Sequence, residues 1–273
     1  MTDRRRLFCR SGGGFPGLDI HVGIWRALQD AGIVADANAG TSAGAVIAAF
    51  DSAGYRADTA GAIVHKLRDR DVREERLFWK LRVPWIDSFL SRRPIVDILD
   101  DLLPLSFSDL KKPLSIFTTD ETNARSCVFE DGDLIMALAA SLAIAGVFPP
   151  VVVHGRKPGT DRVYSDGGTT SYLPLPERWE QYDEIWLLIA RRPIEYTGTG
   201  LVGRLLWNVD LTCEDQVRDT IVFAQARHPC VRVIRPACRV GSSLHFNHDL
   251  IDGAYSYTQS WLYEQNLCGR GTH

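Results

Sequence analysis

The chain of 273 residues lacks a long hydrophobic run, a paired-cysteine motif and an excess of basic charge. Its longest apolar run, from Met136 to Phe148, is shorter than the roughly 18 residues of a membrane-spanning helix. The first residues lack the apolar stretch of a secretory signal. A net charge of -3 gives no sign of a nucleic-acid-binding surface. We therefore expect a soluble, cytoplasmic protein that binds no nucleic acid.

The six cysteines are widely separated along the chain and include no C-x-x-C pair. In a chain of this length, such spacing favours free thiols in a reducing compartment over a disulfide framework or a zinc site. The sequence also contains no internal repeat, low-complexity segment or linker. We predict a single domain that spans residues 1–273 and binds no metal.

Short apolar runs alternate with glycine-rich turns and helical patterns from the beginning of the chain. Residues 7–9 indicate a short buried strand, and apolar residues recur at helical spacing after the glycine-rich stretch 11–17. A second apolar run, residues 33–39, leads into another turn and another helical pattern. This alternation predicts an α/β fold with a mostly parallel sheet and helices on its faces.

The stretch Gly40-Thr41-Ser42-Ala43-Gly44 joins the second apolar run to a run of small residues. A serine flanked by glycines at a strand-to-helix turn matches the G-x-S-x-G pattern of a nucleophile elbow. The glycines allow a tight turn, and the N-terminus of the next helix favours negative charge that develops near the serine. One interpretation is that Ser42 is a covalent nucleophile. The other is that Thr41 or Ser42 only caps a helix.

The earlier glycine-rich turn has several interpretations. Its Gly12-x-Gly14-x-x-Gly17 spacing fits the dinucleotide-binding fingerprint, which also needs an acid at the end of the second strand. Asp36 precedes that end, and the elbow occupies the expected position. The glycines could serve only a tight loop, or leave backbone N–H groups free to stabilise an oxyanion. Two such turns at adjacent strand ends favour acyl transfer, with the oxyanion held by N–H groups of Gly12, Gly13, Gly14 and Ala43.

A nucleophilic serine needs a base, and the histidines have no distinctive context. His245 and His248 form a late pair in a polar stretch, and His21, His65 and His154 are scattered. Asp166-Gly167-Gly168 instead places a carboxylate after a short apolar run, where glycines permit close approach of the backbone. A carboxylate tuned by burial can accept the serine proton directly. The competing interpretation is an ordinary Asp-Gly turn.

Together these motifs resemble the patatin-like phospholipase family. Three of its motifs occur in family order: Gly12-Gly13-Gly14-Phe15-Pro16-Gly17, then Gly40-Thr41-Ser42-Ala43-Gly44, then Asp166-Gly167-Gly168. The segment from Ala140 to Pro150 is similar to the one that precedes the family's aspartate. The resemblance covers the chain from the first strand to at least Pro174 and continues more weakly to the C-terminal helices.

The resemblance implies a three-layer α/β/α sandwich with a mostly parallel central sheet, and a Ser–Asp dyad that uses no histidine, metal or other cofactor. It assigns the nucleophile to Ser42, the base to Asp166 and the oxyanion donors to the Gly12–Gly14 turn. The remaining motif glycines are Gly17, Gly40, Gly44, Gly167 and Gly168. Two positions depart from the family, since Pro16 replaces a basic residue and Tyr172 replaces a frequent asparagine.

We therefore expect a lipid acyl hydrolase that acts on phospholipids, lysophospholipids or other acyl esters and makes peripheral contact with a membrane. The alternative is a weakly active or inactive relative that serves as a lipid-binding or regulatory module, an interpretation that Pro16 keeps open. A nucleotide-binding oxidoreductase would give the elbow no role. Within an insertion at residues 56–94, the mixed aromatic, aliphatic and basic segment 77–90 would form a lid or membrane-contacting flap, or only pack a core.

Overall fold

The computed structural model describes residues 4–67, 93–145, 147–155, 157, 159–191, 200–238 and 246–267. The segment 77–90, His245 and Cys268 lie outside the described residues. The hypothesis of a lid within residues 56–94 therefore stays a prediction, as does the assignment of the whole chain to one domain.

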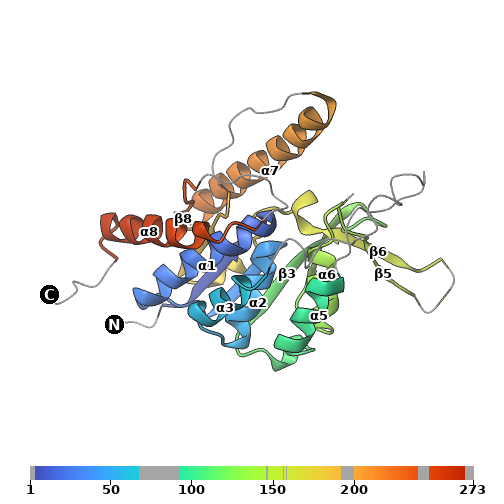
Figure 1. Ribbon diagram of the computed structural model, residues 1–273, viewed down its shortest axis with the longest axis horizontal. Coiled ribbons are helices and arrows are strands. Elements are labelled where there is room, and N and C mark those ends of the chain that lie inside the picture. The colour runs from blue at the N-terminus through green and yellow to red at the C-terminus, as the bar shows by residue number, and fades with distance from the viewer. Residues whose placement is uncertain are drawn as a thin grey trace.

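A mixed sheet runs through the centre of the protein (Figure 1). Its strands are β1 (Arg6–Arg10), β2 (Ala37–Thr41), β3 (Leu114–Asp120), β4 (Arg125–Phe129), β5 (Val151–Val153), β6 (Arg162–Asp166), β7 (Glu184–Leu188) and β8 (Val231–Ile234). The neighbours follow the order β5-β6-β3-β2-β1-β7-β8, and β4 pairs with β3. Five consecutive strands of the sheet, β3-β2-β1-β7-β8, are parallel to one another. The pairs β3–β4, β3–β6 and β5–β6 are antiparallel. The prediction of a mostly parallel central sheet is confirmed.

Helices cover both faces of this sheet (Figure 1). On one face lie α1 (Gly14–Asp30), α2 (Ala43–Ala53), α3 (Ala57–Val64), α5 (Arg93–Leu102), α6 (Leu134–Ser141) and α8 (Asp249–Glu264). The other face is covered by α7 (Gly200–Arg227), which extends past the sheet, and by the segment 172–179. Short 3-10 helices are η2 (Phe107–Asp109), η3 (Gly167–Thr169) and η4 (Trp179–Gln181).

The first strand shows how the sequence builds these layers. Successive side chains of a strand point to opposite faces, so a buried strand packs on both sides. Leu7 and Cys9 pack in the same apolar cluster as Val217 of α7. Phe8 points to the other side and packs in the cluster that contains Ile20 of α1. The continuous apolar run of β1 is therefore the pattern expected of a strand with helices on both faces.

The register of β3 brings two distant turns together. Strand β4 pairs with residues 116–120 along one edge of β3, so β2 and β6 both lie along the opposite edge. There Thr41, the last residue of β2, is paired with Phe117. Asp166, the last residue of β6, is paired with the next residue, Thr118. Because β2 is parallel to β3 and β6 is antiparallel, the two strands end head to head, and Ser42 follows directly at their junction.

Helix α6 is shorter than its sequence pattern predicts. The apolar run indicates a helix up to Ala145, but the helix ends at Ser141. The reason lies in the sheet, because the carbonyl of Ala143 accepts a 2.9 Å hydrogen bond from the backbone N–H of Asp166. The residues after Ser141 thus leave the helix to support the end of β6.

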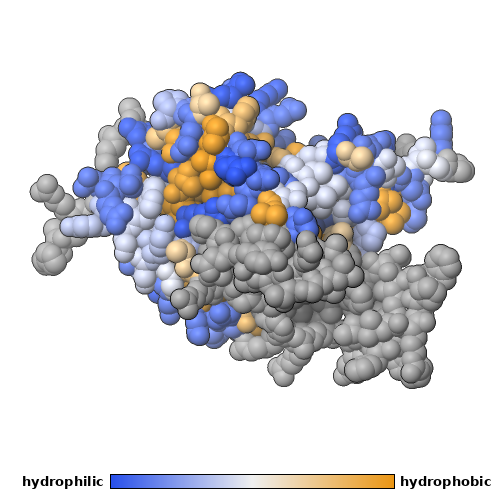
Figure 2. Space-filling model, turned by 90° about the horizontal axis from the view of Figure 1, so that it is seen from above, coloured by the Kyte–Doolittle hydropathy of each residue, from blue (hydrophilic) through white to orange (hydrophobic). Residues whose placement is uncertain are grey.

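The surface seen in Figure 2 is mainly hydrophilic, with a band of hydrophobic residues between hydrophilic ones. Exposed apolar residues of α7 include Val209, Val222 and Phe223. Within the described ranges, no helix combines the length and apolar character needed to cross a bilayer.

Candidate active site

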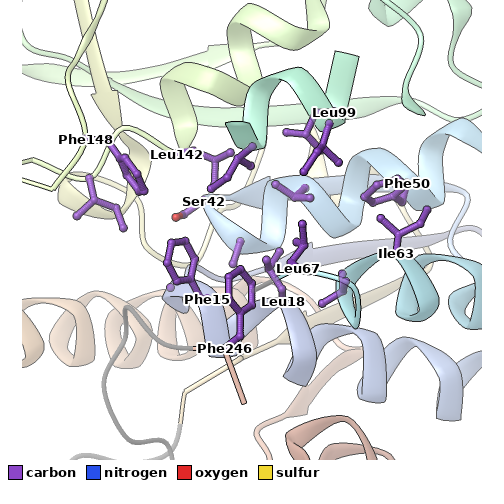
Figure 3. A pocket seen from close by; sticks show the side chains of 17 residues that line it. Phe15, Leu18, Ser42, Phe50, Ile63, Leu67, Leu99, Leu142, Phe148 and Phe246 are labelled. Carbon is purple, nitrogen blue, oxygen red and sulfur yellow. The ribbon is translucent and has the colours of Figure 1, made fainter. Parts of the chain in front are cut away.

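The elbow holds Ser42 in a strained backbone conformation between β2 and α2. Its φ of 54° and ψ of -124° lie in a region that residues with a side chain rarely adopt. Ser42 occupies the N-cap position of α2, but its side chain makes no capping hydrogen bond. The helix-cap interpretation therefore does not account for this serine. Its hydroxyl is directed between Phe15 and Phe148, into a pocket (Figure 3).

The glycines on either side of the serine are required by close backbone contacts. A Cβ added at Gly40 would lie 2.5 Å from the Cα of Ala45. A Cβ added at Gly44 would lie 2.4 Å from the carbonyl oxygens of both Arg10 and Ser11. The second contact joins the elbow to the strand end that precedes the first glycine-rich turn.

Ser141 fixes the elbow from the side of α6. The backbone N–H of Ser42 donates a 2.8 Å hydrogen bond to Ser141 Oγ, and this hydroxyl donates a 2.8 Å bond to the carbonyl of Phe117. The buried Ser141 thus connects the end of α6, the elbow and β3. Sequence reasoning did not assign it a role, although it lies in the Ala140–Pro150 segment that resembled the family.

Asp166 stands at the end of β6 and begins the turn η3. Its Oδ1 accepts a 2.7 Å hydrogen bond from the backbone N–H of Gly168. The neighbouring Gly167 passes close to β3, since an added Cβ would lie 2.3 Å from the carbonyl oxygen of Phe117. Gly167 therefore has a steric reason to be glycine, and the Gly168 N–H holds the carboxylate beside the junction where β2 and β6 meet.

Ser42 and Asp166 form a buried pair. Their exposed fractions are 4% and 7%, and burial raises the pKa of Asp166 to about 6, an effect that the Ser42 side chain and the Gly168 N–H oppose. Asp166 Oδ2 is buried and has no hydrogen-bond partner within the described chain, although the Ser42 side chain lowers the pKa of this carboxyl group. Catalytic hydrogen bonds are often long in free enzymes and shorten when substrate binds.

The first glycine-rich turn lies against the elbow. A Cβ added at Gly17 would lie 3.2 Å from the Cβ of Ala43. The N–H of Gly12 is already used, because it donates a 2.9 Å hydrogen bond to the carbonyl of Tyr172. Within the described chain, the N–H groups of Gly13, Gly14 and Ala43 donate to no backbone acceptor. Of the sequence-based oxyanion candidates, these three remain available for a ligand, and Gly12 shapes the turn.

Pro16 fits this turn without cost to the helix. It is the third residue of α1, where the backbone N–H of any residue would lack an acceptor inside the helix. Proline is tolerated in a first helical turn for this reason. The departure from the family at Pro16 therefore leaves the N–H groups of Gly13 and Gly14 in place.

Tyr172, the second departure, joins the predicted base loop, residues Asp166–Gly168, to the first glycine-rich turn. Its backbone carbonyl accepts the hydrogen bond from the Gly12 N–H. Its ring lies against both glycines, since an added Cβ would be 2.9 Å from the ring at Gly12 and 3.2 Å from it at Gly168. The guanidinium of Arg191 lies 5.7 Å from the ring centre. The ring is buried, and this burial raises the pKa of its hydroxyl.

The described histidines considered as bases have other partners. His21 Nε2 lies 2.8 Å from the carbonyl of Ser11, and burial lowers its pKa to about 3. His154 pairs with Asp161, and His248 pairs with Asp19. The ring of His65 lies tilted against that of His248, with centres 4.7 Å apart. Asp36, the candidate acid of a dinucleotide site, accepts a hydrogen bond from the backbone N–H of Arg6, at the beginning of β1.

An apolar pocket extends away from the serine between the helices of one face (Figure 3). Its space is about 600 Å³, part of which is open to solvent. The residues that line it are Gly14, Phe15, Leu18, Ser42, Ala43, Val46, Phe50, Ile63, Val64, Leu67, Ile95, Ile98, Leu99, Leu142, Ile144, Phe148 and Phe246. Among these lining residues, Ser42 alone carries a polar side chain, so the pocket suits an acyl chain attached to a reacting ester. Across the described residues, no cluster of three or more histidine, cysteine or acidic side chains could hold a metal ion.

The sequence model of the patatin-like phospholipase family matches residues 8–179. The chain belongs to this family. The match covers more than half of the 273 residues and includes both glycine-rich turns and the Asp166 loop. The resemblance noted in the sequence is thereby confirmed.

Relatives of this patatin-like chain are longer proteins. An uncharacterized NTE family protein of Mycobacterium bovis is 31% identical over 158 residues, which make up 57% of this chain and 40% of that protein. The neuropathy target esterase sws of Drosophila melanogaster is 28% identical over 166 residues, 60% of this chain and 11% of the esterase. The chain thus spans less than half the length of these curated relatives.

A solved structure supports the fold of the patatin-like chain. The crystal structure of VipD from Legionella pneumophila matches with a TM-score of 0.53 and 14% sequence identity, covering 96% of this chain and 67% of VipD. At this identity the likeness concerns the fold alone. It confirms the predicted α/β architecture, a mixed sheet with helices on both sides.

Proposed function

We propose that this protein is a serine hydrolase that cleaves the carboxylic ester bonds of phospholipids or lysophospholipids. The observation that carries the proposal is the buried Ser42–Asp166 pair at one end of an apolar pocket. Ser42 is the nucleophile and Asp166 is the general base, and the proposed reaction uses no metal or other cofactor. The lipid would reach the site from a membrane surface, by peripheral contact of a cytoplasmic protein.

In the first half of the reaction, Asp166 accepts the proton of the Ser42 hydroxyl while Oγ attacks the ester carbonyl. The negative charge on the carbonyl oxygen is stabilised by backbone N–H groups of Gly13, Gly14 and Ala43. The tetrahedral intermediate then collapses, and Asp166 gives its proton to the departing alcohol. This step leaves the acyl group on Ser42.

In the second half, Asp166 removes a proton from water, which attacks the acyl-serine carbonyl. The same N–H groups hold the second oxyanion, and Asp166 returns the proton to Ser42 as the free acid is released. The raised pKa of Asp166, about 6, suits both tasks, because the carboxylate is mostly ionised at neutral pH yet basic enough to accept a proton. Each oxyanion donor typically stabilises the transition state by about 3 kcal/mol.

An active-site label tests the nucleophile. A fluorophosphonate probe should modify the wild-type protein, and the label should be lost in Ser42→Ala. Ser52→Ala is a matched control, since Ser52 is a buried serine on the same helix. Chromogenic acyl-ester hydrolysis should fall by about 10⁴-fold or more in Ser42→Ala and stay near wild type in Ser52→Ala.

Two results would contradict the proposal. Ester turnover by Ser42→Ala at the wild-type rate would exclude Ser42 as nucleophile. A folded wild-type protein that neither reacts with the probe nor turns over esters would favour the lipid-binding or regulatory module instead. If Ser42 is labelled and esters are hydrolysed, mass spectrometry of products after incubation with mixed membranes would identify which lipids are cleaved, and at which ester bond.

A further inference from the structure

The pocket follows one face of helix α2. Its lining residues from this helix are Ala43, Val46 and Phe50, whose spacing of three and four residues places them on the same side. Ala43 comes directly after Ser42, whereas Phe50 lies at the other end of the row (Figure 3). An acyl chain bound to Ser42 therefore has a path along α2 from Ala43 past Val46 to Phe50.

The helix gives this path a length. Phe50 follows Ser42 by eight residues, which corresponds to about 12 Å along the helix axis. A fully extended chain advances about 1.2 Å per bond, as the dimensions of an extended peptide indicate. The path from Ser42 to Phe50 therefore accommodates an extended acyl chain of roughly eight to ten carbons.

Phe50 is the last residue of α2 that lines the pocket, and it is firmly held. Its side chain is only 1% exposed, and its ring makes an edge contact with Tyr55, with centres 5.2 Å apart and planes at 83°. The Tyr55 hydroxyl is itself held by a 2.6 Å hydrogen bond to the carbonyl of Leu102. Ile63 and Leu99 also line the pocket. Because the rings support each other in a packed core, rotation of Phe50 out of the path is opposed.

We propose that Phe50 limits the length of the acyl group, so that the enzyme prefers medium-chain esters of roughly eight to ten carbons. This inference rests on the proposed hydrolase function, and it adds the identity of the acyl substrate and the residue that selects it. Methylenes that enter the pocket bind the apolar walls, whereas a longer chain must displace Phe50 or leave its end in water. One methylene in a hydrophobic pocket changes specificity by about tenfold or more.

Three variants test this selection. Phe50→Leu shortens the side chain at the end of the path and keeps it apolar, which limits the loss of stability. Val46→Phe places a ring halfway between Ser42 and Phe50. Phe107→Leu is a matched control, because Phe107 is a buried phenylalanine of the same apolar cluster that does not line the pocket.

The measurement is kcat/KM for p-nitrophenyl butyrate, octanoate, decanoate, dodecanoate and palmitate, each below its micelle concentration. The wild type and Phe107→Leu should prefer octanoate and decanoate over palmitate by at least about tenfold. In Phe50→Leu, dodecanoate should gain about tenfold relative to octanoate. In Val46→Phe, octanoate should lose about tenfold or more relative to butyrate.

The outcomes separate this inference from the proposed function. An active wild type that hydrolyses palmitate as well as octanoate would overturn the length limit while leaving the Ser42 mechanism intact. Unchanged chain-length profiles in both Phe50→Leu and Val46→Phe would overturn the assignment of the path. Absence of ester turnover and of Ser42 labelling in the wild type would instead overturn the hydrolase function, and the length limit with it.

Discussion

The turns that carry Ser42 and Asp166 follow strands that end head to head, and the second glycines of the two turns meet different kinds of contact. At the elbow, backbone meets backbone, since a Cβ on Gly44 would lie 2.4 Å from two carbonyl oxygens. In the Asp166–Gly168 turn, Gly167 also lies close to backbone, whereas the second glycine, Gly168, faces side chains. A Cβ there would lie 2.9 Å from Asp166 Oδ1 and 3.2 Å from the ring of Tyr172.

This difference separates a rigid position at Gly44 from an adjustable one at Gly168. Backbone atoms of packed strands cannot move without shifting the sheet, whereas a side chain can change its rotamer at modest cost. The elbow therefore stores the strain at Ser42 in a frame that keeps it in place. Next to Gly168, the side chains of Asp166 and Tyr172 can adjust without a shift of the sheet.

The largest effect should come from adding one methyl group to the rigid turn. Gly44→Ala should lower the free energy of unfolding by about 4 kcal/mol or more, because its Cβ cannot avoid the carbonyls of Arg10 and Ser11. Gly168→Ala should cost only about 1 kcal/mol, because the atoms it meets belong to side chains. Urea denaturation measures both.

Gly253→Ala serves as a control for the effect of alanine itself. Gly253 lies within α8, and an added Cβ would make ordinary contact, 3.6 Å from Cys238 Sγ. Alanine favours a helix interior by up to about 1 kcal/mol, so this variant should be neutral or more stable. Equal costs for Gly44→Ala and Gly168→Ala would contradict the distinction between the two turns.

The buried carboxylate should make the base loop a source of instability. With a pKa of about 6, Asp166 keeps its proton in the folded state at pH values where the unfolded chain has lost it. Stability therefore falls as pH rises from about 4 to about 6, by up to about 3 kcal/mol. Asp166→Asn removes this loss and should be more stable than wild type at pH 8 but not at pH 4.

Thermal unfolding at both pH values measures this gain, with Asp252→Asn, an exposed carboxylate on α8, as the control that should change little. In the same experiment, Asp166→Asn should lose ester turnover by about 10³-fold or more. Wild-type kcat/KM should fall about tenfold per pH unit below about pH 6, as Asp166 becomes protonated. A constant rate down to pH 4.5 would show that another group is the base.

The sequence reveals both turns because each contains a glycine at a close backbone contact. Gly40, Gly44 and Gly167 stand where backbone segments approach closely, and only glycine meets this need, so the pattern is readable without a structure. The alternation of apolar runs and helices likewise predicts the layers. The head-to-head ends of β2 and β6 are not readable, because they depend on which edge of β3 each strand occupies.

Contacts between side chains distant in sequence are also beyond the reach of local patterns. Ser141 bonds to the elbow across 99 residues and resembles any other small residue at the end of an apolar helix. The early end of α6 has the same cause, since it depends on the pairing of Ala143 with Asp166. Tyr172 was recognised only as a departure from the family, and its contacts with both turns required the fold.

Ser141 should therefore matter more to the elbow than its size indicates. Ser141→Ala leaves the Ser42 N–H without its acceptor and removes one donor to the Phe117 carbonyl, at a cost of about 2 kcal/mol. Because the strained Ser42 loses a support, kcat should fall about tenfold with little change in KM. Ser141→Thr keeps a hydroxyl and should recover part of the rate.

The control for this variant is Ser115→Ala. Ser115 lies at the start of β3, away from the elbow, and its hydroxyl donates a hydrogen bond to Glu130. It should lose some stability while kcat stays near wild type. If both serine variants lower stability equally and neither changes kcat, Ser141 is only a packing residue and the elbow needs no side support.

The smallest effect is expected from the hydroxyl of Tyr172. Tyr172→Phe keeps the ring that lies against Gly12 and Gly168, and keeps the backbone carbonyl that accepts from Gly12. The free energy of unfolding and the activation free energy for kcat should therefore each change by less than about 1 kcal/mol. Tyr172→Ala removes the ring and should lower kcat several-fold more, because the base loop then loses its contact with the first glycine-rich turn. A loss in Tyr172→Phe as large as in Tyr172→Ala would mean that the hydroxyl and its neighbour Arg191, and not the ring, hold the adjustable turn in place.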